Sequence, residues 1–297
     1  MINLVIIIVN FNTEKLVLEC LDSIFKNKPD GEFKVIVVDN NSTDDSVESI
    51  KKLFPEVDLI ESKENLGFAG GNNLALTGIN AKYYLLLNSD TLVNKNSLDN
   101  LVNFAENSDY GICSCKLTYQ NGSFQPNAGE LPSFIPVLLW LSGLDDILGK
   151  IIHIKSYQAR DKGYYKNKTQ VGWISGSVML IKKDVIEKIG VLDEGIFMYG
   201  EDVDYCFRAN RAGFRVGWTD EAEIIHIGGA SSSKPKYNQW IGEFRGMIYV
   251  YNKLFGFMPA QLIRIFFYFF ILIRAFAFLV LGKILYSRTY AKIFINL

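Results

Sequence analysis

Residues 4–12 read Leu4-Val5-Ile6-Ile7-Ile8-Val9-Asn10-Phe11-Asn12, and this stretch decides the fold. Its six consecutive apolar residues predict a strand that is buried on both faces, as in the middle of a parallel sheet. The run ends in asparagines, not in small residues, and no basic region precedes it, so it lacks the pattern of a secretion signal. We therefore expect an α/β domain built outward from this strand.

Strands and helices alternate through the next hundred residues. Apolar runs predict strands, and apolar residues at helical spacing predict the helices between them: strands at 34–38, 57–61 and 83–87, helices within 17–25, 47–54 and 98–105. A glycine-rich turn at 67–73 leads into a further short helix. The alternation predicts right-handed βαβ units and a single Rossmann-like, mostly parallel sheet flanked by helices.

The second half of the chain is less regular. Residues 131–170 are first apolar and then polar, which indicates an insertion on the acceptor side that acts as an acceptor-binding lid. Order then returns, with these expected elements: a strand at 171–182 interrupted at Ser175-Gly176-Ser177, a short helix capped by Asp184, a helix from Glu201 to Ala212 that stops at Gly213, and strands at 214–218 and 223–227. We expect one catalytic domain over residues 1–229 and a separate tail over residues 230–297.

Charge divides the chain at the same place. The 31 basic and 32 acidic residues nearly cancel, and this gives no reason to expect nucleic-acid binding. However, residues 230–297 contain nine basic residues and one acid, Glu243, which makes +8 and leaves −9 for residues 1–229. The four cysteines form no CxxC pair, and only two histidines accompany them, so we expect reduced, buried thiols and no structural zinc site.

The basic tail is also apolar and aromatic. Residues 262–281 include only two charged side chains, Arg264 and Arg274, and their length suits a helix that spans a membrane. A central arginine costs roughly 2.5–3.5 kcal/mol on insertion. We therefore favour helices that lie on an anionic membrane surface, with an oligomer-forming helix and a true span as the alternatives. The expected location is the cytoplasm, with peripheral attachment to the cytoplasmic face of the membrane.

Polar clusters follow three of the predicted strands. They contain Asn10 and Asn12, then Asp39 and Asn41, then Asn88-Ser89-Asp90. Each cluster alone is also typical of a turn. Because ligands of such sheets bind beyond the carboxyl ends of the strands, three clusters at one edge indicate a binding site.

The chemistry of these side chains indicates a nucleotide. Asp39 has the acceptor that the N3–H of a uracil or thymine ring requires, and the neighbouring amides are suited to ribose. Asp90 is suited to a divalent cation, Mg²⁺ or Mn²⁺, between two phosphates. Residues 65–73 allow the backbone to approach a ligand closely, and the candidates there are Asn65, Gly67, Gly71 and Asn72.

The segment 197–204 contains Glu201, Asp202 and Asp204 within four residues at a predicted helix start. One interpretation is a capped and solvated helix end. The other is a general base whose pKa is raised by the like charges beside it. His226 is either an ordinary polar residue or, beside Asp90, part of a metal or diphosphate site. We assign no role to His153.

These motifs, taken together and in this order, resemble glycosyltransferase family 2 in its rhamnosyltransferase-like branch, over about residues 1–229. The resemblance implies a GT-A fold and an inverting, metal-dependent transfer of a sugar from a nucleotide sugar. Asp39 matches the pyrimidine-reading aspartate, Asp202 the catalytic base, and His226 the downstream metal-site histidine. Asn88-Ser89-Asp90 matches the DXD motif, with Asn88 in place of the first aspartate and Asp90 as the metal ligand.

On the acceptor side, the resemblance assigns Trp173, Ser175 and Gly176 to the wall of the site, beside Tyr199 and Glu201. The donor that the branch favours is dTDP-rhamnose, with UDP-hexoses and UDP-galactofuranose as alternatives. We expect a lipid-linked or cell-surface polysaccharide acceptor, which agrees with a membrane-facing tail, and a homo-oligomer is a further possibility. A nucleotidyltransferase and a non-catalytic membrane scaffold are the competing classes. The early basic phosphate loop of the former is absent from residues 10–15, and a scaffold has no need of the carboxylates at 201–204.

Overall fold

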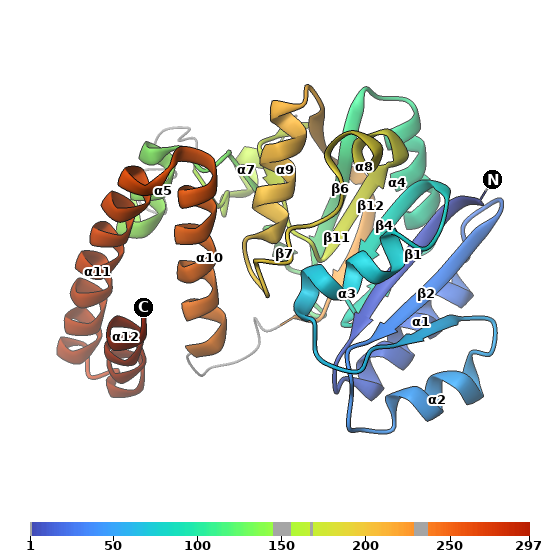
Figure 1. Cartoon of the computed structure of the whole chain (residues 1–297), viewed down its shortest axis with the longest axis horizontal. Helices are drawn as coiled ribbons and strands as arrows, with labels where there is room; N and C mark the ends of the chain where they lie inside the picture. Colours follow the sequence, from blue (N-terminus) through green and yellow to red (C-terminus); the bar gives the residue numbers. More distant parts are fainter. Residues whose placement is uncertain (1, 145–155, 167–168, 229–236) are drawn as a thin grey trace.

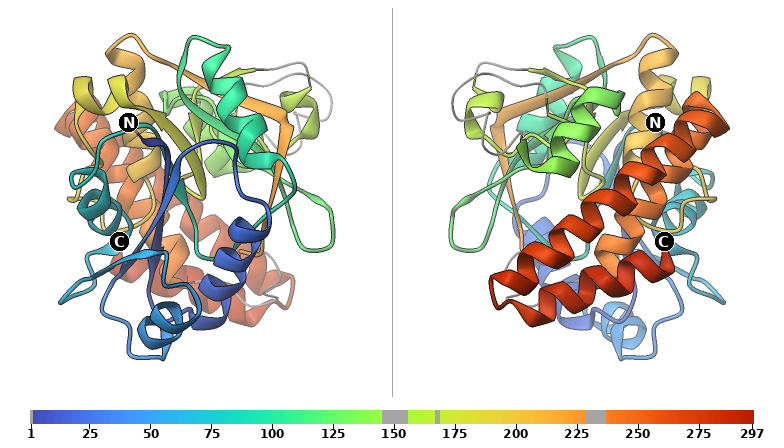
Figure 2. Two further views of the ribbon diagram at one scale, coloured as in Figure 1. Left: turned by 90° about the vertical axis from the view of Figure 1, so that its right-hand side faces the viewer. Right: turned by 90° about the vertical axis from the view of Figure 1, so that its left-hand side faces the viewer.

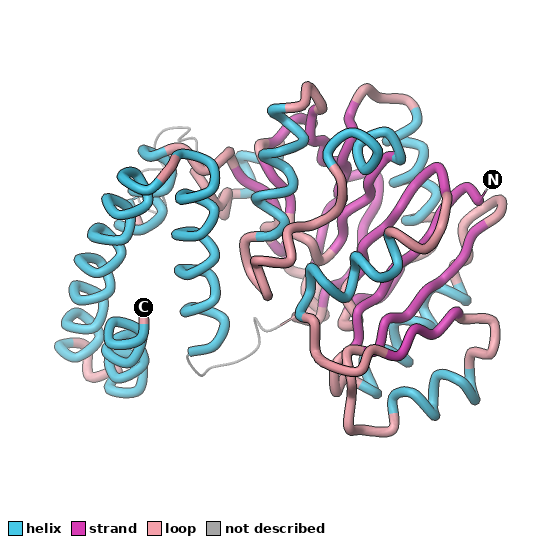
Figure 3. The backbone as a smooth tube through the Cα atoms, viewed as in Figure 1, coloured by secondary structure: helices cyan, strands magenta, loops and turns pink. Residues whose placement is uncertain are grey.

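The computed structural model describes residues 2–144, 156–166, 169–228 and 237–297. It consists of an α/β part and a helical part that lies beside it (Figure 1). The strands gather in the α/β part, whereas the last sixty residues are helical (Figure 3). Of the expected features, residues 145–155 (with His153) and 167–168 of the insertion and residues 230–236 of the tail lie outside the described residues.

The large sheet has the strand order β3-β2-β1-β4-β11-β6-β12-β5, with β7 beside β6 and β9 beside β12. The strands are β1 (Ile2–Asn10), β2 (Phe33–Asp39), β3 (Asp58–Glu61), β4 (Ala81–Leu87), β5 (Thr91–Val93), β6 (Tyr110–Thr118), β7 (Phe124–Gln125), β9 (Gln170–Val171), β11 (Val178–Lys182) and β12 (Arg215–His226). A separate pair consists of β8 (Ala128–Gly129) and β10 (Trp173–Ile174). Strands β3, β2, β1 and β4 are parallel, and β12 is parallel to β6, but β11 is antiparallel to both of its neighbours.

Helices cover both faces of this sheet. The helices that pack on it are α1 (Glu14–Lys26), α2 (Ser46–Leu53), α3 (Gly67–Leu76), α4 (Ser97–Glu106), α8 (Lys183–Ile189) and α9 (Glu201–Arg211). The other helices, α5 (Phe134–Ser142), α7 (Lys162–Tyr165), α10 (Tyr237–Phe255), α11 (Phe257–Val280) and α12 (Ile284–Asn296), belong to the insertion and to the helical part. Alternate side chains of β1 enter two different cores: Ile6 packs with α1, α2 and α4, and Ile7 with the side of α3, α8 and α9. The expectation that residues 4–9 form a strand buried on both faces is confirmed.

Three local expectations need correction. The glycine-rich stretch is not a turn but the first part of α3, because its glycines fit where larger residues do not: a Cβ at Gly71 would lie 2.9 Å from Val9 Cγ1. This packing outweighs a helix penalty of about 1 kcal/mol per glycine. Asp184 does not cap α8 but lies in its first turn, where its charge still favours the helix dipole. The two last predicted strands form one strand, β12, with an irregularity between Thr219 and Glu223.

The C-terminal helices pack on one another and on α5. The right-hand view of Figure 2 shows α11 crossing the helical side of the molecule, with α12 folded back along it. Phe267 and Ile271 of α11 are buried, and Arg274 reaches back to α5, where its guanidinium donates to the Leu141 carbonyl oxygen at 2.8 Å. Arg274 of this apolar helix therefore binds carbonyl groups in the last turn of α5.

Among the described residues, α11 is the one helix that is long and apolar enough to cross a membrane, which by itself is weak evidence. Much of its surface is apolar and exposed. The exposed apolar side chains of α11 include Leu262, Ile265, Phe269, Leu272, Ile273, Phe276, Leu279 and Val280. All four cysteines are buried and free, as expected, and burial raises the pKa of Cys20 to about 12.

Candidate active site

A cleft of about 970 Å³ opens where β1, β2 and β4 end. The parts of the chain that line it are the residues after those strands, the insertion, the segment 173–177, the segment before and within α9, and one face of α10. Most of the predicted site residues line this cleft: Asn65, Gly67, Asn88, Ser89, Asp90, Trp173, Ser175, Gly176, Tyr199, Glu201, Asp202 and His226. Segments far apart in sequence are thus brought to one place, as the strand-end argument requires.

Asp39 belongs to a buried polar network at the ends of β1 and β2. The Asn10 Nδ2 donates to Asp39 Oδ2 at 2.8 Å, and the Ser42 backbone N–H donates to Asp39 Oδ1 at 2.8 Å. Asn12 links the loop after β1 to the loop after β2, because its Oδ1 accepts from the Thr43 N–H at 2.7 Å. Asn12 and Asn41 both have positive φ, which asparagine tolerates better than most residues. The network holds Asp39 rigidly beside the cleft, although Asn10, Asn12, Asp39 and Asn41 are not among the described residues that line it.

The start of α3 is fixed against two other loops. The Asn40 Nδ2 donates to the Gly67 carbonyl at 2.9 Å, and Asn65 Oδ1 accepts from the Gly67 N–H at 2.9 Å. Gly67 has φ +70° and lies against the Phe197 backbone, so a side chain there meets both strain and a clash. Gly71 and Asn72 lie deeper: Gly71 packs on Val9, and Asn72 Nδ2 donates to the Phe68 carbonyl. They shape the cleft through packing and do not line it.

Asp90 and His226 meet although 136 positions separate them. Antiparallel pairing of β12 with β5 places His226 beside Thr91, and His226 Nε2 then lies 3.1 Å from Asp90 Oδ1. The same nitrogen lies 3.3 Å from Asn88 Nδ2, and His226 Nδ1 lies 3.2 Å from Gln125 Oε1. Burial alone would raise the pKa of Asp90, but the hydrogen bond and charge of His226 hold it below its ordinary value.

This donor set fits a divalent cation that takes its other ligands from a diphosphate and from water. Asp90 offers a carboxylate and His226 an imidazole, oriented through Gln125. Within the described ranges there is no group of three or more histidine, cysteine, aspartate or glutamate side chains that would hold a metal by themselves. Any cation here therefore depends on the ligand for its remaining coordination.

Asp202 occupies the first turn of α9 and faces the cleft. Its Oδ2 accepts from the Gly176 N–H at 3.1 Å, and its Oδ1 accepts from the Val203 N–H at 2.8 Å. Burial raises its pKa in spite of these hydrogen bonds, which act in the opposite direction. The expected rise is therefore present, but its main cause is loss of hydration and not the like charges that the sequence indicated.

The other two carboxylates of this segment have different surroundings. Glu201 is 5% exposed, and its Oε2 has no hydrogen-bond partner among the residues described. Burial, and then the charge of Asp202, raise its pKa well above the ordinary value. A capped and solvated helix end is therefore excluded for Glu201.

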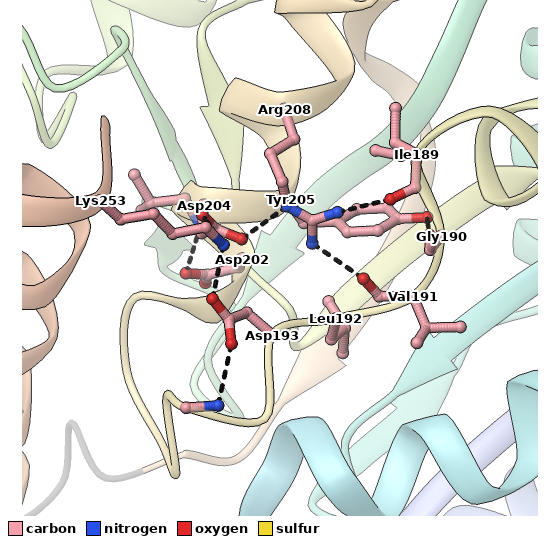
Figure 4. A network of polar contacts seen from close by, with 12 residues as sticks. Ile189, Gly190, Val191, Leu192, Asp193, Asp202, Asp204, Tyr205, Arg208 and Lys253 are labelled. Atoms are coloured by element: carbon pink, nitrogen blue, oxygen red, sulfur yellow. Dashed lines mark hydrogen bonds and ion pairs between the residues drawn. The ribbon is translucent and has the colours of Figure 1, made fainter. Parts of the chain in front are cut away.

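Asp204 has a structural part in a polar network that joins three elements (Figure 4). It is fully buried, and it pairs with Arg208 at 2.7 Å and with Lys253 of α10 at 2.8 Å. Lys253 also contacts Asp193 at 2.5 Å. This charged network fixes α10 against α9 close to Asp202.

The predicted wall residues lie together. Trp173 Nε1 donates to the Tyr157 carbonyl at 2.7 Å, and the two rings stack with centroids 5.4 Å apart. Ser175 and Ser177 hydroxyl oxygens lie 3.0 Å apart, and Gly176 packs against the Phe68 ring. Together they form a rigid aromatic and polar surface beside Asp202.

Sequence reasoning missed a whole side of the cleft. The lining residues that it did not identify include Trp140, Tyr157, Gln158 and Arg160 from the insertion, and Gln239, Trp240, Glu243, Met247 and Val250 from α10. One signal for α10 was present: Glu243 is the single acid in a strongly basic tail. An isolated acid of this kind indicates a specific partner more than a solvated surface.

Comparison with known proteins bears on the chemistry. The sequence model of glycosyl transferase family 2 matches residues 5–190, and that of glycosyl transferase family group 2 matches residues 153–297. The chain is 28% identical to rhamnosyltransferase WbbL of Escherichia coli, covering 74% of this chain and 82% of that protein. It is 28% identical to a low-salt glycan biosynthesis hexosyltransferase of Haloferax volcanii, covering 75% and 67%. It is 26% identical to the N-acetylglucosaminyl-diphospho-decaprenol L-rhamnosyltransferase of Mycobacterium tuberculosis, covering 65% and 66%.

The chain thus spans about two thirds of the length of the last two relatives. Among solved structures, the fold resembles Staphylococcus aureus TarS 1–349 with a TM-score of 0.54 and 19% identity, covering 84% of this chain and 66% of that one. It also resembles the mannosyltransferase PcManGT of Pyrobaculum calidifontis, solved with GDP-Man and Mn²⁺, with a TM-score of 0.57 and 18% identity, covering 98% and 73%. At these identities the solved structures support the GT-A fold.

Proposed function

The chain belongs to glycosyl transferase family 2 and is a glycosyltransferase, and from this premise we propose that it transfers rhamnose from dTDP-rhamnose to a hydroxyl of a lipid-linked or cell-surface polysaccharide acceptor, with inversion. One observation carries the proposal: Asp202, a carboxylate of raised pKa, lines the same cleft as the Asp90–His226 pair. A base and an anchor for a nucleoside diphosphate are the two things that such a transfer needs.

The donor assignment has two supports. Asp39 and its amide neighbours form a fixed polar network beside the cleft, with the acceptor and donor groups that suit a pyrimidine base and its ribose. Two of the relatives carry the name rhamnosyltransferase. UDP-hexoses and UDP-galactofuranose satisfy the same base contact and are the alternative donors.

We assign a divalent cation, Mg²⁺ or Mn²⁺, to Asp90 and His226. When bound, it would neutralise charge on the departing diphosphate and help to orient it. This chain's own contribution is to hold the His226 imidazole through Gln125 and to keep Asp90 ionised through the His226 contact.

The proton transfer falls to Asp202. The ionised carboxylate takes the proton of the acceptor hydroxyl as that oxygen forms a bond to the anomeric carbon. The bond between the anomeric carbon and the diphosphate oxygen breaks on the opposite face, and its electron pair leaves with the nucleoside diphosphate. The product has inverted configuration, and the proton resides on Asp202.

The test is Asp202→Asn, with Asp220→Asn, an exposed residue of β12, as the matched control. We expect transfer to be abolished while dTDP binding, measured by calorimetry, stays nearly unchanged. The control should retain both. Near-normal turnover in Asp202→Asn would refute the assignment. Release of nucleoside diphosphate from a nucleotide sugar separates a transferase from a nucleotidyltransferase, which consumes a nucleoside triphosphate, and from a scaffold, which does neither.

We further propose that residues 1–229 form the catalytic domain and that the helices after residue 230 attach the enzyme peripherally to the cytoplasmic face of the membrane. The exposed apolar face of α11 and the exposed basic residues Lys283, Arg288 and Lys292 support this. We expect flotation with vesicles that contain phosphatidylglycerol, and release by alkaline carbonate without detergent. A need for detergent indicates a true span, and stable dimers or larger species without lipid indicate an oligomer-forming helix.

A further inference from the structure

The helix α10 presents one face to the cleft. Its lining residues are spaced so that they fall on a single side of a helix: Gln239, Trp240, Glu243, Met247 and Val250. The part of this face nearest the start of α10 is polar, and the part nearest its end is apolar. This helix belongs to the segment that the sequence separated from the catalytic domain, so no site residue was predicted on it.

Glu243 is the charged group on this face. Gln239 Nε2, one turn earlier, donates to Glu243 Oε1 at 3.0 Å. The charges of Arg160 and Arg274 lower the pKa of Glu243, and the charge of Asp202 raises it. Burial is the largest influence and raises its pKa. Glu243 is half-buried at the wall of the cleft, where its carboxylate can accept hydrogen bonds from the hydroxyls of a ligand.

Aromatic rings form the neighbouring surface. Trp140 and Tyr157 meet edge to face with centroids 5.2 Å apart, and Tyr157 stacks on Trp173. Trp140 also contacts Phe244 of α10, with centroids 6.3 Å apart. Flat apolar faces beside carboxylates and amides are the combination that binds a sugar ring, whose faces carry C–H groups and whose edge carries hydroxyls.

The position of Glu243 relative to Asp202 is rigid. Gly246 packs directly on the Tyr199 carbonyl, and a Cβ at Gly242 would lie 2.7 Å from the Tyr199 ring. At the far end of α10, Lys253 pairs with Asp204, two residues after Asp202. Two attachments therefore hold α10 against the segment that carries the base.

We propose that Glu243 and Gln239 are the positioning residues for the acceptor sugar: they hydrogen-bond hydroxyls next to the one that attacks, while the Trp140–Tyr157–Trp173 surface packs on the ring. This rests on the proposed function. The pair fixes which hydroxyl reaches Asp202, and so it sets acceptor specificity and linkage without touching the donor.

The test compares Glu243→Ala, Glu243→Gln and Gln239→Ala with Asn238→Ala, a matched change at an exposed α10 residue outside the cleft lining. The probes are dTDP-rhamnose, Mg²⁺ and a synthetic N-acetylglucosaminyl-diphospho-lipid, the acceptor type in the name of one relative. Three quantities are measured: kcat/KM for the acceptor, KM for the donor, and hydrolysis of the donor without acceptor.

We expect Glu243→Ala to lower kcat/KM for the acceptor about 10- to 100-fold, the usual effect of losing hydrogen bonds to a charged group. Donor KM and acceptor-independent hydrolysis should stay unchanged, Glu243→Gln should recover part of the loss, and Asn238→Ala should match the wild type. Equal losses in transfer and hydrolysis, or no change in kcat/KM, overturn the proposal. A wild-type chain that binds and hydrolyses dTDP-rhamnose but accepts no sugar also overturns it, whereas a wild type that neither binds nor turns over any nucleotide sugar contradicts the proposed function itself.

Discussion

Replacing Gly246 by alanine is the sharpest test of whether α10 belongs to the catalytic unit. Gly246 lies in the middle of α10, where its backbone meets the Tyr199 carbonyl oxygen with no room for a side chain. Tyr199 itself has φ +72° and precedes Gly200, which has φ +112°, so the loop before Asp202 has little freedom to move.

The size of the effect follows from this contact. Real Cβ contacts begin near 3.0 Å, and an added Cβ at residue 246 overlaps the carbonyl oxygen so closely that the two backbones must separate by about 1 Å. Such overpacking costs about 1–3 kcal/mol in the free energy of unfolding. A shift of ~1 Å in a positioned group costs about 100-fold in rate. We therefore expect a modest loss of stability and a much larger loss of kcat.

The assay combines thermal unfolding with steady-state transfer kinetics and dTDP calorimetry. Gly78→Ala is the control, because a Cβ there would lie 3.4 Å from the Leu74 carbonyl oxygen, an ordinary contact. Gly242→Ala is a graded comparison, since its obstacle is the Tyr199 ring, which rotates more easily than a backbone moves. If Gly246→Ala and Gly78→Ala both keep the wild-type kcat, then α10 does not support Asp202, the proposed base, and the expected loss of kcat is refuted.

Three further outcomes follow from the site. Burial raises the pKa of Asp202, and the ionised form is the proposed base, so kcat/KM should fall on acidification at a pH above the value of about 3.9 for an ordinary aspartate. A pH profile with an unshifted acid limb would contradict this. Glu201 binds its proton more tightly in the folded than in the unfolded state, so its ionised form lowers the stability of the fold at pH 8. Glu201→Gln should therefore raise the melting temperature at pH 8 more than at pH 5. An equal change at both pH values argues against a buried ionised group. His226→Ala should raise the Mg²⁺ concentration needed for half-maximal activity by ~10-fold or more, and an unchanged Mg²⁺ titration would exclude His226 as a metal-site residue.

The parts of the fold that local chemistry determines were predictable. The apolar run at residues 4–9 and the periodic helices around it gave the parallel half of the sheet, and the polar residues at the strand ends gave one edge of the cleft. Asp90 and His226 were paired from motif resemblance, and their 3.1 Å separation follows from the β5–β12 pairing, which no short sequence pattern specifies.

The missed parts depend on tertiary packing. Residues 67–73 were expected as a turn because glycine disfavours helices, but close approach to Val9 selects glycine within α3. The α10 face was missed because the charge boundary at residue 230 suggested a separate tail. Its lining residues are ordinary for any amphipathic helix, and only contact with Tyr199 shows what the helix faces.

The contact between Arg274 and the Leu141 carbonyl has a practical consequence for making this protein. A common way to reduce the exposed apolar surface of an enzyme is to end the chain before an apolar helix, which here means before α11. Here that deletion removes Phe267, which packs on Phe244 of α10, and it frees the end of α5, which carries Trp140. The shortened protein would lose the packing behind one wall of the cleft together with its exposed apolar surface. Exchanging outward residues such as Phe269 and Phe276 for polar ones, with α11 kept whole, is the better route to a soluble and active enzyme.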